Sequence, residues 1–242
     1  MSANLLLDDL FGARIVWVAE RKDRERVQEE AFRKLKADGL EPYFVPYGGS
    51  CPIGALGYAF AVEETLAQGL NPDWFLFCTS SGGTHAGLVL GARLFGYRGK
   101  ILGISIDESE VWLKTRVSDL ASDASELLGH RIDFYPEEIF ADDLYCQAGY
   151  GVLTMVEKEA VRLFARTEGL LLDPVYTGRA VAGLVDLIGK GFPRREESVL
   201  FLNTGGQPAL FAEKYQPYLI LLRHIMAISI SISQLEFSRG GA

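Results

Sequence analysis

The segment Ser80-Ser81-Gly82-Gly83-Thr84 combines three hydroxyl side chains with two consecutive glycines. Glycines let the backbone curl so that successive N–H groups converge on one point, where the hydroxyls add further donors. A helix is expected directly after this loop, and its positive end would also attract an anion. No Lys-Ser/Thr pair follows and no G-x-G-x-x-G pattern is present, which excludes a triphosphate or dinucleotide loop. The segment therefore predicts a cradle for one phosphate group; a tight turn with a serine helix cap is the alternative.

Two further glycine-rich turns follow apolar runs, at 47–54 and 203–208. Ligands of open α/β sheets collect at the carboxyl ends of strands, so the three loops are expected to line one crevice. In the last loop, the hydroxyl of Thr204 stands at the expected strand tip, where it can reach a ring atom of a ligand. A purely structural turn that opens a helix at Pro208 is the competing interpretation.

Two tyrosines stand in positions that favour function over core packing. Tyr150 lies between Gly149 and Gly151, and Tyr176 directly precedes Thr177, the expected cap of a helix. A side chain just before a helix cap projects from the helix mouth. Taken alone, however, each tyrosine is more often a packing or interface residue than a functional one.

Alternating strands and helices must position these loops. Short apolar runs predict strands over 14–18, 43–46, 74–78, 101–106 and 199–202. Helical patterns fill 53–68, 152–167 and 179–188, and further helices are expected to end near 39, 95 and 128. Continuous apolar strands that alternate with helices indicate a parallel sheet covered on both faces. The fold class is α/β.

Composition excludes several classes of protein. The 242 residues carry 24 basic and 32 acidic side chains, a formal net charge of −8. Binding to nucleic acid or to an anionic membrane surface needs clustered Lys and Arg, so neither partner is expected. The cysteines Cys51, Cys78 and Cys146 are too few and too scattered for a disulfide framework or a metal knuckle. These counts favour a cytoplasmic protein without a metal.

The two ends of the chain are atypical. The start has no secretory signal, because acidic residues interrupt its apolar run. Near the other end, residues 218–232 are apolar but carry Arg223 and His224, and they are shorter than the roughly 18–20 apolar residues of a spanning helix. Residues 227–233 alternate with period two, which predicts a strand within an appended tail.

Together, five stretches resemble the fold-type II pyridoxal-phosphate enzymes, in particular the D-cysteine desulfhydrase and 1-aminocyclopropane-1-carboxylate deaminase family. They are residues 46–58, 80–87, 149–151, 172–179 and 203–211, in the family's order. The resemblance implies a tryptophan synthase β-like fold of open twisted parallel sheets, the cofactor pyridoxal 5′-phosphate and a homodimer. It also implies the remainder of a small domain over 1–68, a cofactor-binding portion of the large domain over 69–212, and an atypical tail over 213–242.

The resemblance also implies roles for individual residues. The loop from Ser80 to Thr84 would hold the cofactor phosphate, and Thr204 would hydrogen-bond the pyridine nitrogen. Tyr150 and Tyr176 would lie over the substrate as a proton-transfer or orienting pair, with Tyr47 near the cofactor. A hydroxyl at the ring nitrogen leaves the ring mostly unprotonated, which suits elimination better than transamination.

Two departures from the family pattern stand out. Cys51 replaces the usual asparagine of the Gly-Gly-Ser-Asn-Pro turn. The Gly-Asn-Lys segment with the Schiff-base lysine, and the Ser-Asn-His loop for the substrate carboxylate, are both absent. The lysines present are Lys22, Lys34, Lys36, Lys100, Lys114, Lys158, Lys190 and Lys214, none in that setting. We therefore expect an N-terminally truncated enzyme that is inactive alone.

Three functions remain open from the sequence. The loop sequences favour desulfhydrase-like elimination, in which D-cysteine gives pyruvate, sulfide and ammonia. Deamination of the cyclopropane amino acid is the second hypothesis. The third is a non-catalytic relic that still binds pyridoxal phosphate through residues 81–84.

Overall fold

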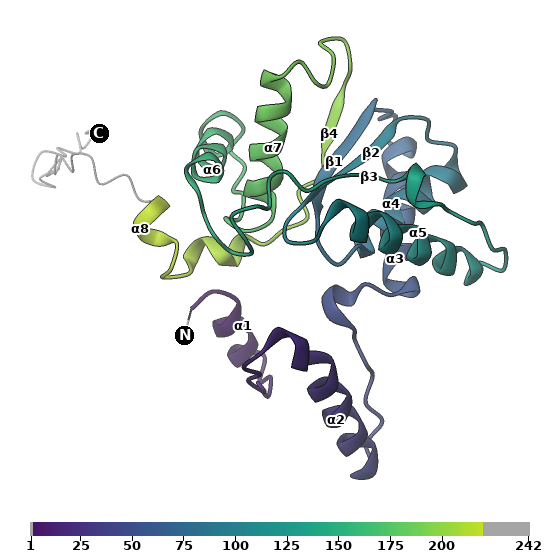
Figure 1. Ribbon diagram of the computed structural model, residues 1–242, viewed down its shortest axis with the longest axis vertical. Coiled ribbons are helices and arrows are strands. Elements are labelled where there is room, and N and C mark those ends of the chain that lie inside the picture. Colours follow the sequence, from purple (N-terminus) through teal and green to yellow (C-terminus); the bar gives the residue numbers. More distant parts are fainter. Residues whose placement is uncertain (1, 220–242) are drawn as a thin grey trace, which may run out of the picture.

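The computed structural model describes residues 2–219 and is built around one parallel sheet (Figure 1). Its strands stand in the order β3-β2-β1-β4. Their bounds are β1 Trp74–Thr79, β2 Lys100–Ser105, β3 Phe140–Asp142 and β4 Val199–Phe201. Helices cover both faces, so the predicted α/β fold class is confirmed.

The central strand β1 reads WFLFCT and is buried along its whole length. Successive side chains of a strand point to opposite faces of the sheet. Phe75 and Phe77 accordingly pack toward one helical layer, whereas Trp74 and Leu76 pack toward the other. A strand covered on both faces needs apolar residues at every position, which explains the continuous apolar run.

Three helices form the first layer: α3 (Pro52–Ala67), α4 (Gly83–Phe95) and α5 (Glu110–Glu126). Alanines and leucines of the three helices form one buried cluster. Helices α3 and α4 approach so closely that a Cβ on Gly91 would lie 2.5 Å from the carbonyl oxygen of Ala59. This close packing fixes the start of α4 against the chain just before α3.

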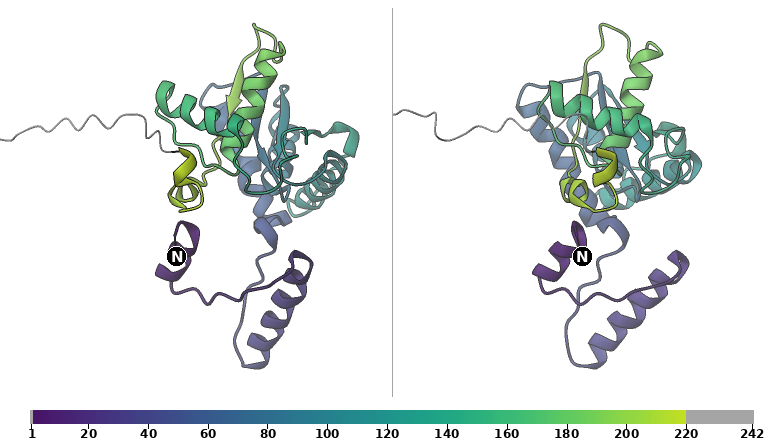
Figure 2. Two further views of the ribbon diagram at one scale, coloured as in Figure 1. Left: turned by 60° about the vertical axis from the view of Figure 1, so that its left-hand side comes forward. Right: turned by 90° about the vertical axis from the view of Figure 1, so that its left-hand side faces the viewer.

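The second layer consists of α6 (Met155–Thr167), α7 (Thr177–Gly189) and the short α8 (Gln216–Leu219). Helix α7 packs Ala180 and Leu184 against the other face of β1 and β2. Its layer lies opposite α3 and α4, as the two turned views show (Figure 2). Short 3-10 turns complete the fold: η1 Arg21–Asp23, η2 Tyr47–Gly49, η3 Pro136–Glu138 and η4 Gln207–Phe211.

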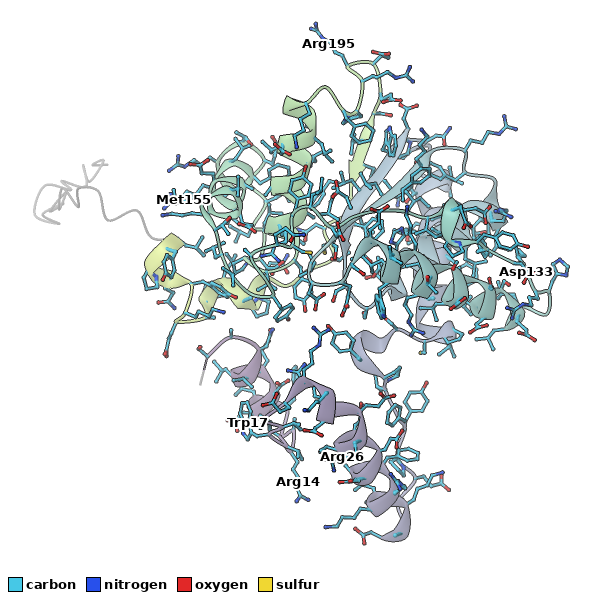
Figure 3. All side chains as sticks on the ribbon, viewed as in Figure 1. Arg14, Trp17, Arg26, Asp133, Met155 and Arg195 are labelled. Carbon is cyan, nitrogen blue, oxygen red and sulfur yellow. The ribbon has the colours of Figure 1, made fainter. Side chains whose placement is uncertain are left out.

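The N-terminal segment carries α1 (Asn4–Leu10) and α2 (Arg24–Ala37) and lies apart from the two layers (Figure 1). The predicted strands at 14–18 and 43–46 are wrong, because neither segment is in a strand. Trp17 and Tyr43 are 76% and 77% exposed, and Figure 3 shows Trp17 on this segment, away from the sheet. A strand needs a neighbour for its backbone groups, and these runs have none among the described residues.

Other expectations are closely matched, with shifts at helix ends. Helix α6 begins at Met155 rather than at 152, because the backbone N–H of Thr154 is capped at 3.0 Å by the Glu157 carboxylate. The predicted strand at 227–233, and most of the predicted tail, lie outside the described residues. No helix within 2–219 is long and apolar enough to cross a membrane.

The strand order creates a crevice at the carboxyl ends of β1 and β4. From β1 the chain passes through α4 to β2, whereas β4, on the other side of β1, is reached through α7. The helices that flank β1 and β4 therefore lie on opposite faces. Such a reversal of strand order opens a ligand crevice at the carboxyl ends of the two strands.

Candidate active site

A cavity of about 290 Å³ lies where β1 and β4 end. A smaller cavity of about 150 Å³ adjoins it and reaches the start of α4. The two share six lining residues: Gly48, Tyr58, Cys78, Ser80, Ser81 and Thr84. The two cavities therefore adjoin along these residues, one at the start of α4 and the other at the end of β4.

The smaller cavity is an anion cradle in its geometry. Gly82 caps α4 in the left-handed conformation, with φ of 87°, which turns the chain sharply from β1 into the helix. The N–H groups of the first helical turn have no partner within a helix, and the helix dipole makes this end positive. The hydroxyls of Ser81 and Thr84 line the same space.

The loop before α3 completes this cradle. The hydroxyl of Ser50 accepts a bond from the Gly83 N–H at 3.0 Å and donates to the Ser81 hydroxyl at 2.7 Å. A Cβ on Gly83 would lie 2.6 Å from the Ser50 hydroxyl, and one on Gly48 would overlap the Ser81 hydroxyl. A larger residue at Gly83 would therefore displace Ser50, which lines the cradle, so the glycine keeps the cradle in the form expected of a phosphate site.

The far end of the larger cavity is neutral. Thr204 and Cys78 lie side by side, with 3.1 Å between the hydroxyl and the thiol. Burial raises the pKa of the Cys78 thiol to about 11, so it stays protonated at neutral pH. The Asp173 carboxylate, whose charge acts on the Cys78 thiol, is fully buried and is bonded to other groups. It accepts bonds from the backbone N–H groups of Val175, Tyr176 and Thr177 and from the Thr177 hydroxyl.

This arrangement differs in one detail from the predicted helix cap. Tyr176, not Thr177, holds the cap position of α7, and Thr177 is the first helical residue. The carboxylate of Asp173 serves the first N–H groups of the helix instead. Tyr176 still projects into the cavity, as its place before a helix start predicts.

The two predicted tyrosines meet. The hydroxyls of Tyr150 and Tyr176 are 2.7 Å apart, and their rings are edge to face with centroids 5.9 Å apart. Burial of Tyr176, together with its hydrogen bond to Tyr150, raises the pKa of the Tyr176 hydroxyl well above its ordinary value. At neutral pH this hydroxyl is protonated, so it can donate a hydrogen bond or a proton into the cavity.

A second chain of polar groups forms the wall beside Tyr47. Its hydroxyl is 3.3 Å from that of Ser80, which donates to the Asp107 carboxylate at 2.6 Å. Arg21, from the N-terminal segment, lies 3.3 Å from Asp107 and 2.7 Å from Glu108. Its guanidinium also stands over the Tyr47 ring, 5.7 Å from the centroid. The N-terminal segment is thereby attached to this wall.

The structure brings the predicted site residues together. Six of them line the larger cavity: Tyr47, Ser80, Ser81, Thr84, Tyr176 and Thr204. Gly82 and Gly83 line the adjoining cradle, and Tyr150 is bonded to the Tyr176 hydroxyl. The roles assigned to these residues stay predictions.

Sequence reasoning missed three residues of this region: Ser50, Cys78 and Asp107. Cys78 is the next-to-last residue of β1, and the rule that ligands gather at strand ends could have identified it. Asp107 likewise lies two residues after the end of β2. Ser50 gave no signal, because only the folded chain places its hydroxyl under the α4 start.

No lysine lines either cavity. Lys22 lies along a separate cavity of about 800 Å³ beside the N-terminal segment, which Tyr47, Ser50 and Ser81 also border. Within 2–219, no three His, Cys, Asp or Glu side chains gather as a metal site would require.

Residues 1–205 match the family described as pyridoxal-phosphate dependent enzyme. The chain belongs to this family. A Pyrococcus abyssi protein with a provisional name as 1-aminocyclopropane-1-carboxylate deaminase is 38% identical over 220 residues, which are 87% of this chain and 64% of the relative. A Methylobacterium nodulans protein named 1-aminocyclopropane-1-carboxylate deaminase is 35% identical over 214 residues, which are 86% of this chain and 64% of the relative.

Solved structures agree with this membership. An ACC deaminase homologue superposes with a TM-score of 0.79 at 35% identity, and the match covers 90% of this chain and 66% of that one. An O-ureido-L-serine synthase, at 16% identity and a TM-score of 0.54, shares the fold alone; the match covers 88% of this chain and 64% of that one. The chain therefore spans just under two thirds of the length of these relatives.

The family membership supplies the cofactor, pyridoxal 5′-phosphate, as the sequence predicts. The residues present fit two parts of this molecule: the cradle at α4 suits its phosphate, and Thr204 suits its ring nitrogen. A lysine for its aldehyde is not among the residues around the cavity.

Proposed function

We propose that this cavity binds pyridoxal phosphate for elimination from a small amino acid, with D-cysteine as the preferred substrate. In this proposal, Ser81 and Thr84 hold the phosphate in the cradle beside Gly83, and Thr204 accepts or donates a hydrogen bond at the ring nitrogen. When bound, the cofactor withdraws electrons from the substrate and so weakens the bond between its α-carbon and hydrogen.

The uncharged surroundings of Thr204 are the observation that favours elimination over other reactions of the cofactor. A carboxylate at the ring nitrogen keeps the ring protonated and able to store a full negative charge. Here the neighbours are a hydroxyl and a protonated thiol, and Asp173 is occupied by the start of α7. A ring of this kind favours a reaction in which the charge leaves with a group on the β-carbon.

The tyrosine pair supports the handling of a proton at that leaving group. Tyr176 holds its proton at neutral pH and lines the cavity, so its hydroxyl can donate to a departing sulfur. Tyr150 orients that hydroxyl through their 2.7 Å contact. The overall reaction breaks the bond between the β-carbon and sulfur, and D-cysteine plus water gives pyruvate, hydrogen sulfide and ammonia.

The chain of 242 residues is proposed to be inactive without an added base. The α-proton must be removed by a group close to the cofactor, which is the task of an amine in this chemistry. None of the residues lining the two cavities is a lysine.

Deamination of 1-aminocyclopropane-1-carboxylate is the second candidate. The names of the two curated relatives favour it, at 35% and 38% identity. Its product would be 2-oxobutanoate with ammonia. The two candidates share the phosphate cradle and differ in the substrate.

The test supplies the missing base chemically. The full chain is incubated with pyridoxal phosphate and methylamine, and D-cysteine, L-cysteine or the cyclopropane amino acid is added. Sulfide and the two keto acids are measured. Protein-free cofactor with methylamine gives the background, which has no preference for either enantiomer.

The proposal predicts that sulfide and pyruvate form faster from D-cysteine than from L-cysteine, and that Tyr176→Phe reduces this excess. Faster formation of 2-oxobutanoate would replace it with the second candidate. Rates equal to the protein-free background, despite bound cofactor, would leave the chain as a binding module without catalysis.

A further inference from the structure

Two buried side chains outside the cavity, those of Arg179 and Tyr215, donate hydrogen bonds to the loop that contains Tyr150. We propose that Arg179 and Tyr215 are positioning residues, which hold the backbone of residues 149–152 so that the Tyr150 hydroxyl reaches that of Tyr176. This inference rests on the proposed function for the importance of the tyrosine pair. The geometry of the loop itself can be tested without any reaction.

Arg179 is a charged residue with almost no contact with water. It is 1% exposed and lies in the first turn of α7, just after Tyr176. One of its terminal nitrogens donates to two loop carbonyls, that of Gly149 at 3.1 Å and that of Val152 at 2.9 Å. A single guanidinium thus fixes both ends of the tyrosine loop to the helix that begins beside Tyr176.

The remaining donors of Arg179 fix the guanidinium itself. Its other terminal nitrogen donates to the carbonyl of Ile106, just after β2, at 2.7 Å. Its Nε donates to Glu157 at 3.0 Å, and this carboxylate is also buried. A planar guanidinium offers five N–H donors in a fixed arrangement, so it can bind all these acceptors at once, whereas a lysine ammonium cannot.

Tyr215 fixes the middle of the same loop. Its side chain is 6% exposed, and its hydroxyl donates to the carbonyl of Gly151 at 2.8 Å. Arg179 and Tyr215 therefore bind the carbonyls of residues 149, 151 and 152. The loop residue that neither of them binds is Tyr150, whose side chain is half exposed and turned to Tyr176.

A purely structural role predicts a different pattern of contacts. The pair of Arg179 and Glu157 alone would neutralise the two buried charges. The further bonds go to the flanks of Tyr150, and they come from the helix that starts beside Tyr176 and from a segment 64 residues away along the chain. A glycine-flanked loop has little stiffness of its own, so these bonds determine where its tyrosine lies.

The decisive variant is Tyr215→Phe, which removes one hydroxyl and keeps the buried ring. The full chain is labelled with 3-fluorotyrosine, and the resonances of Tyr150 and Tyr176 are assigned through their phenylalanine variants. The titration of Tyr176 is followed by fluorine NMR without cofactor or substrate. The matched control is Tyr218→Phe, at an exposed tyrosine three residues further on.

We expect Tyr215→Phe to shift the Tyr150 resonance and to lower the pKa of Tyr176 toward its ordinary value, and we expect the same fall in this pKa for Tyr150→Phe. Arg179→Lys should do the same to a greater extent, and circular dichroism shows whether it folds. Tyr218→Phe should leave both tyrosines unchanged. A folded Tyr215→Phe chain with wild-type resonances and a wild-type Tyr176 titration would overturn the proposal.

Because no substrate or cofactor is present, this outcome is independent of the sulfide assay. The tyrosine pair can be positioned as we propose in a chain that eliminates nothing. Equally, elimination from D-cysteine can occur in a chain whose loop needs neither Arg179 nor Tyr215.

Discussion

At one end of the cavity, the close approach of backbone and side chains requires glycine. The Gly83 N–H is bonded to Ser50, and a Cβ at Gly83 would meet the same hydroxyl at 2.6 Å. The far end of the cavity is uncharged, because its lining includes the Thr204 hydroxyl and the protonated Cys78 thiol. Sequence patterns predicted the glycines and Thr204. They could not predict Ser50, whose role depends on a contact across 33 residues.

Gly83→Asp should abolish tight binding of pyridoxal phosphate. The side chain would fill the cradle and place a carboxylate against the phosphate. A loss of at least about tenfold in affinity is expected, equivalent to ~1.4 kcal/mol or more. Equilibrium dialysis measures it. The control is Gly189→Asp at the exposed end of α7, where a new Cβ meets nothing within 4 Å; equal affinity in both variants would contradict the cradle.

His85 should make the chain sensitive to acid. It is fully buried on α4, neither ring nitrogen has a hydrogen-bond partner within 2–219, and burial lowers its pKa from 6.5 to about 3. Above pH 6.5 the histidine is neutral in both states. Between pH 6.5 and 3 only the unfolded chain binds this proton. The free energy of unfolding therefore decreases by up to ~1.4 kcal/mol for each pH unit by which the pH is lowered.

Urea unfolding at a series of pH values measures this effect. His85→Leu should remove that part of the pH dependence, whereas the exposed His130→Gln should retain it. Identical slopes in wild type and His85→Leu would show that His85 takes up its proton while folded.

The contact between helices α3 and α4 determines where the site forms. Because Gly91 has no side chain, α4 lies directly against the backbone of α3 at Ala59. This close approach places the Tyr47–Ser50 turn, just before α3, under the start of α4, just after β1. The phosphate cradle is a product of this packing.

Gly91→Ala should therefore destabilise the fold although alanine is the better helix former. The new Cβ would lie 2.5 Å from the Ala59 oxygen and 2.8 Å from its Cα, both backbone atoms that cannot turn away. The expected loss in unfolding free energy is up to about 2 kcal/mol, from an overpacking cost of ~1–3 kcal/mol less a helix-propensity gain of ~1 kcal/mol.

Its control, Gly57→Ala on α3, should instead stabilise by about 0.5–1 kcal/mol, because a Cβ there meets nothing within 4 Å. Chemical denaturation of both variants measures the difference. Changes of the same sign and size would contradict the close helix contact.

The sequence predicted β1, β2, β4 and the helices that cover them, but it missed α1 and β3 and placed two strands wrongly in the N-terminal segment. Trp74 to Cys78 form a strand because two parallel neighbours pair with them. The run from Arg14 to Val18 has comparable strand propensity and no such neighbour within 2–219. Arg179 gave only a faint signal: a cation in the first turn of a helix is unfavourable for the helix dipole, so a special reason was needed to retain it.

As a whole, the chain combines a cavity that we propose binds the cofactor with less than two thirds of the length of its relatives. The family membership rests on the match of residues 1–205, and the switch in strand order opens the cavity at the carboxyl ends of β1 and β4. The N-terminal segment is attached to that edge through Arg21. What the cavity does not contain is an amine for the aldehyde of the cofactor.

The most direct test of this account measures how the cofactor is held. Pyridoxal phosphate and 4′-deoxypyridoxine 5′-phosphate, which lacks the aldehyde, are titrated into the full chain, followed by borohydride reduction and mass spectrometry. The account predicts affinities within about threefold, or ~0.7 kcal/mol, and no cofactor fixed to any lysine. Cofactor trapped on a lysine by borohydride, with much weaker binding of the deoxy compound, would contradict it.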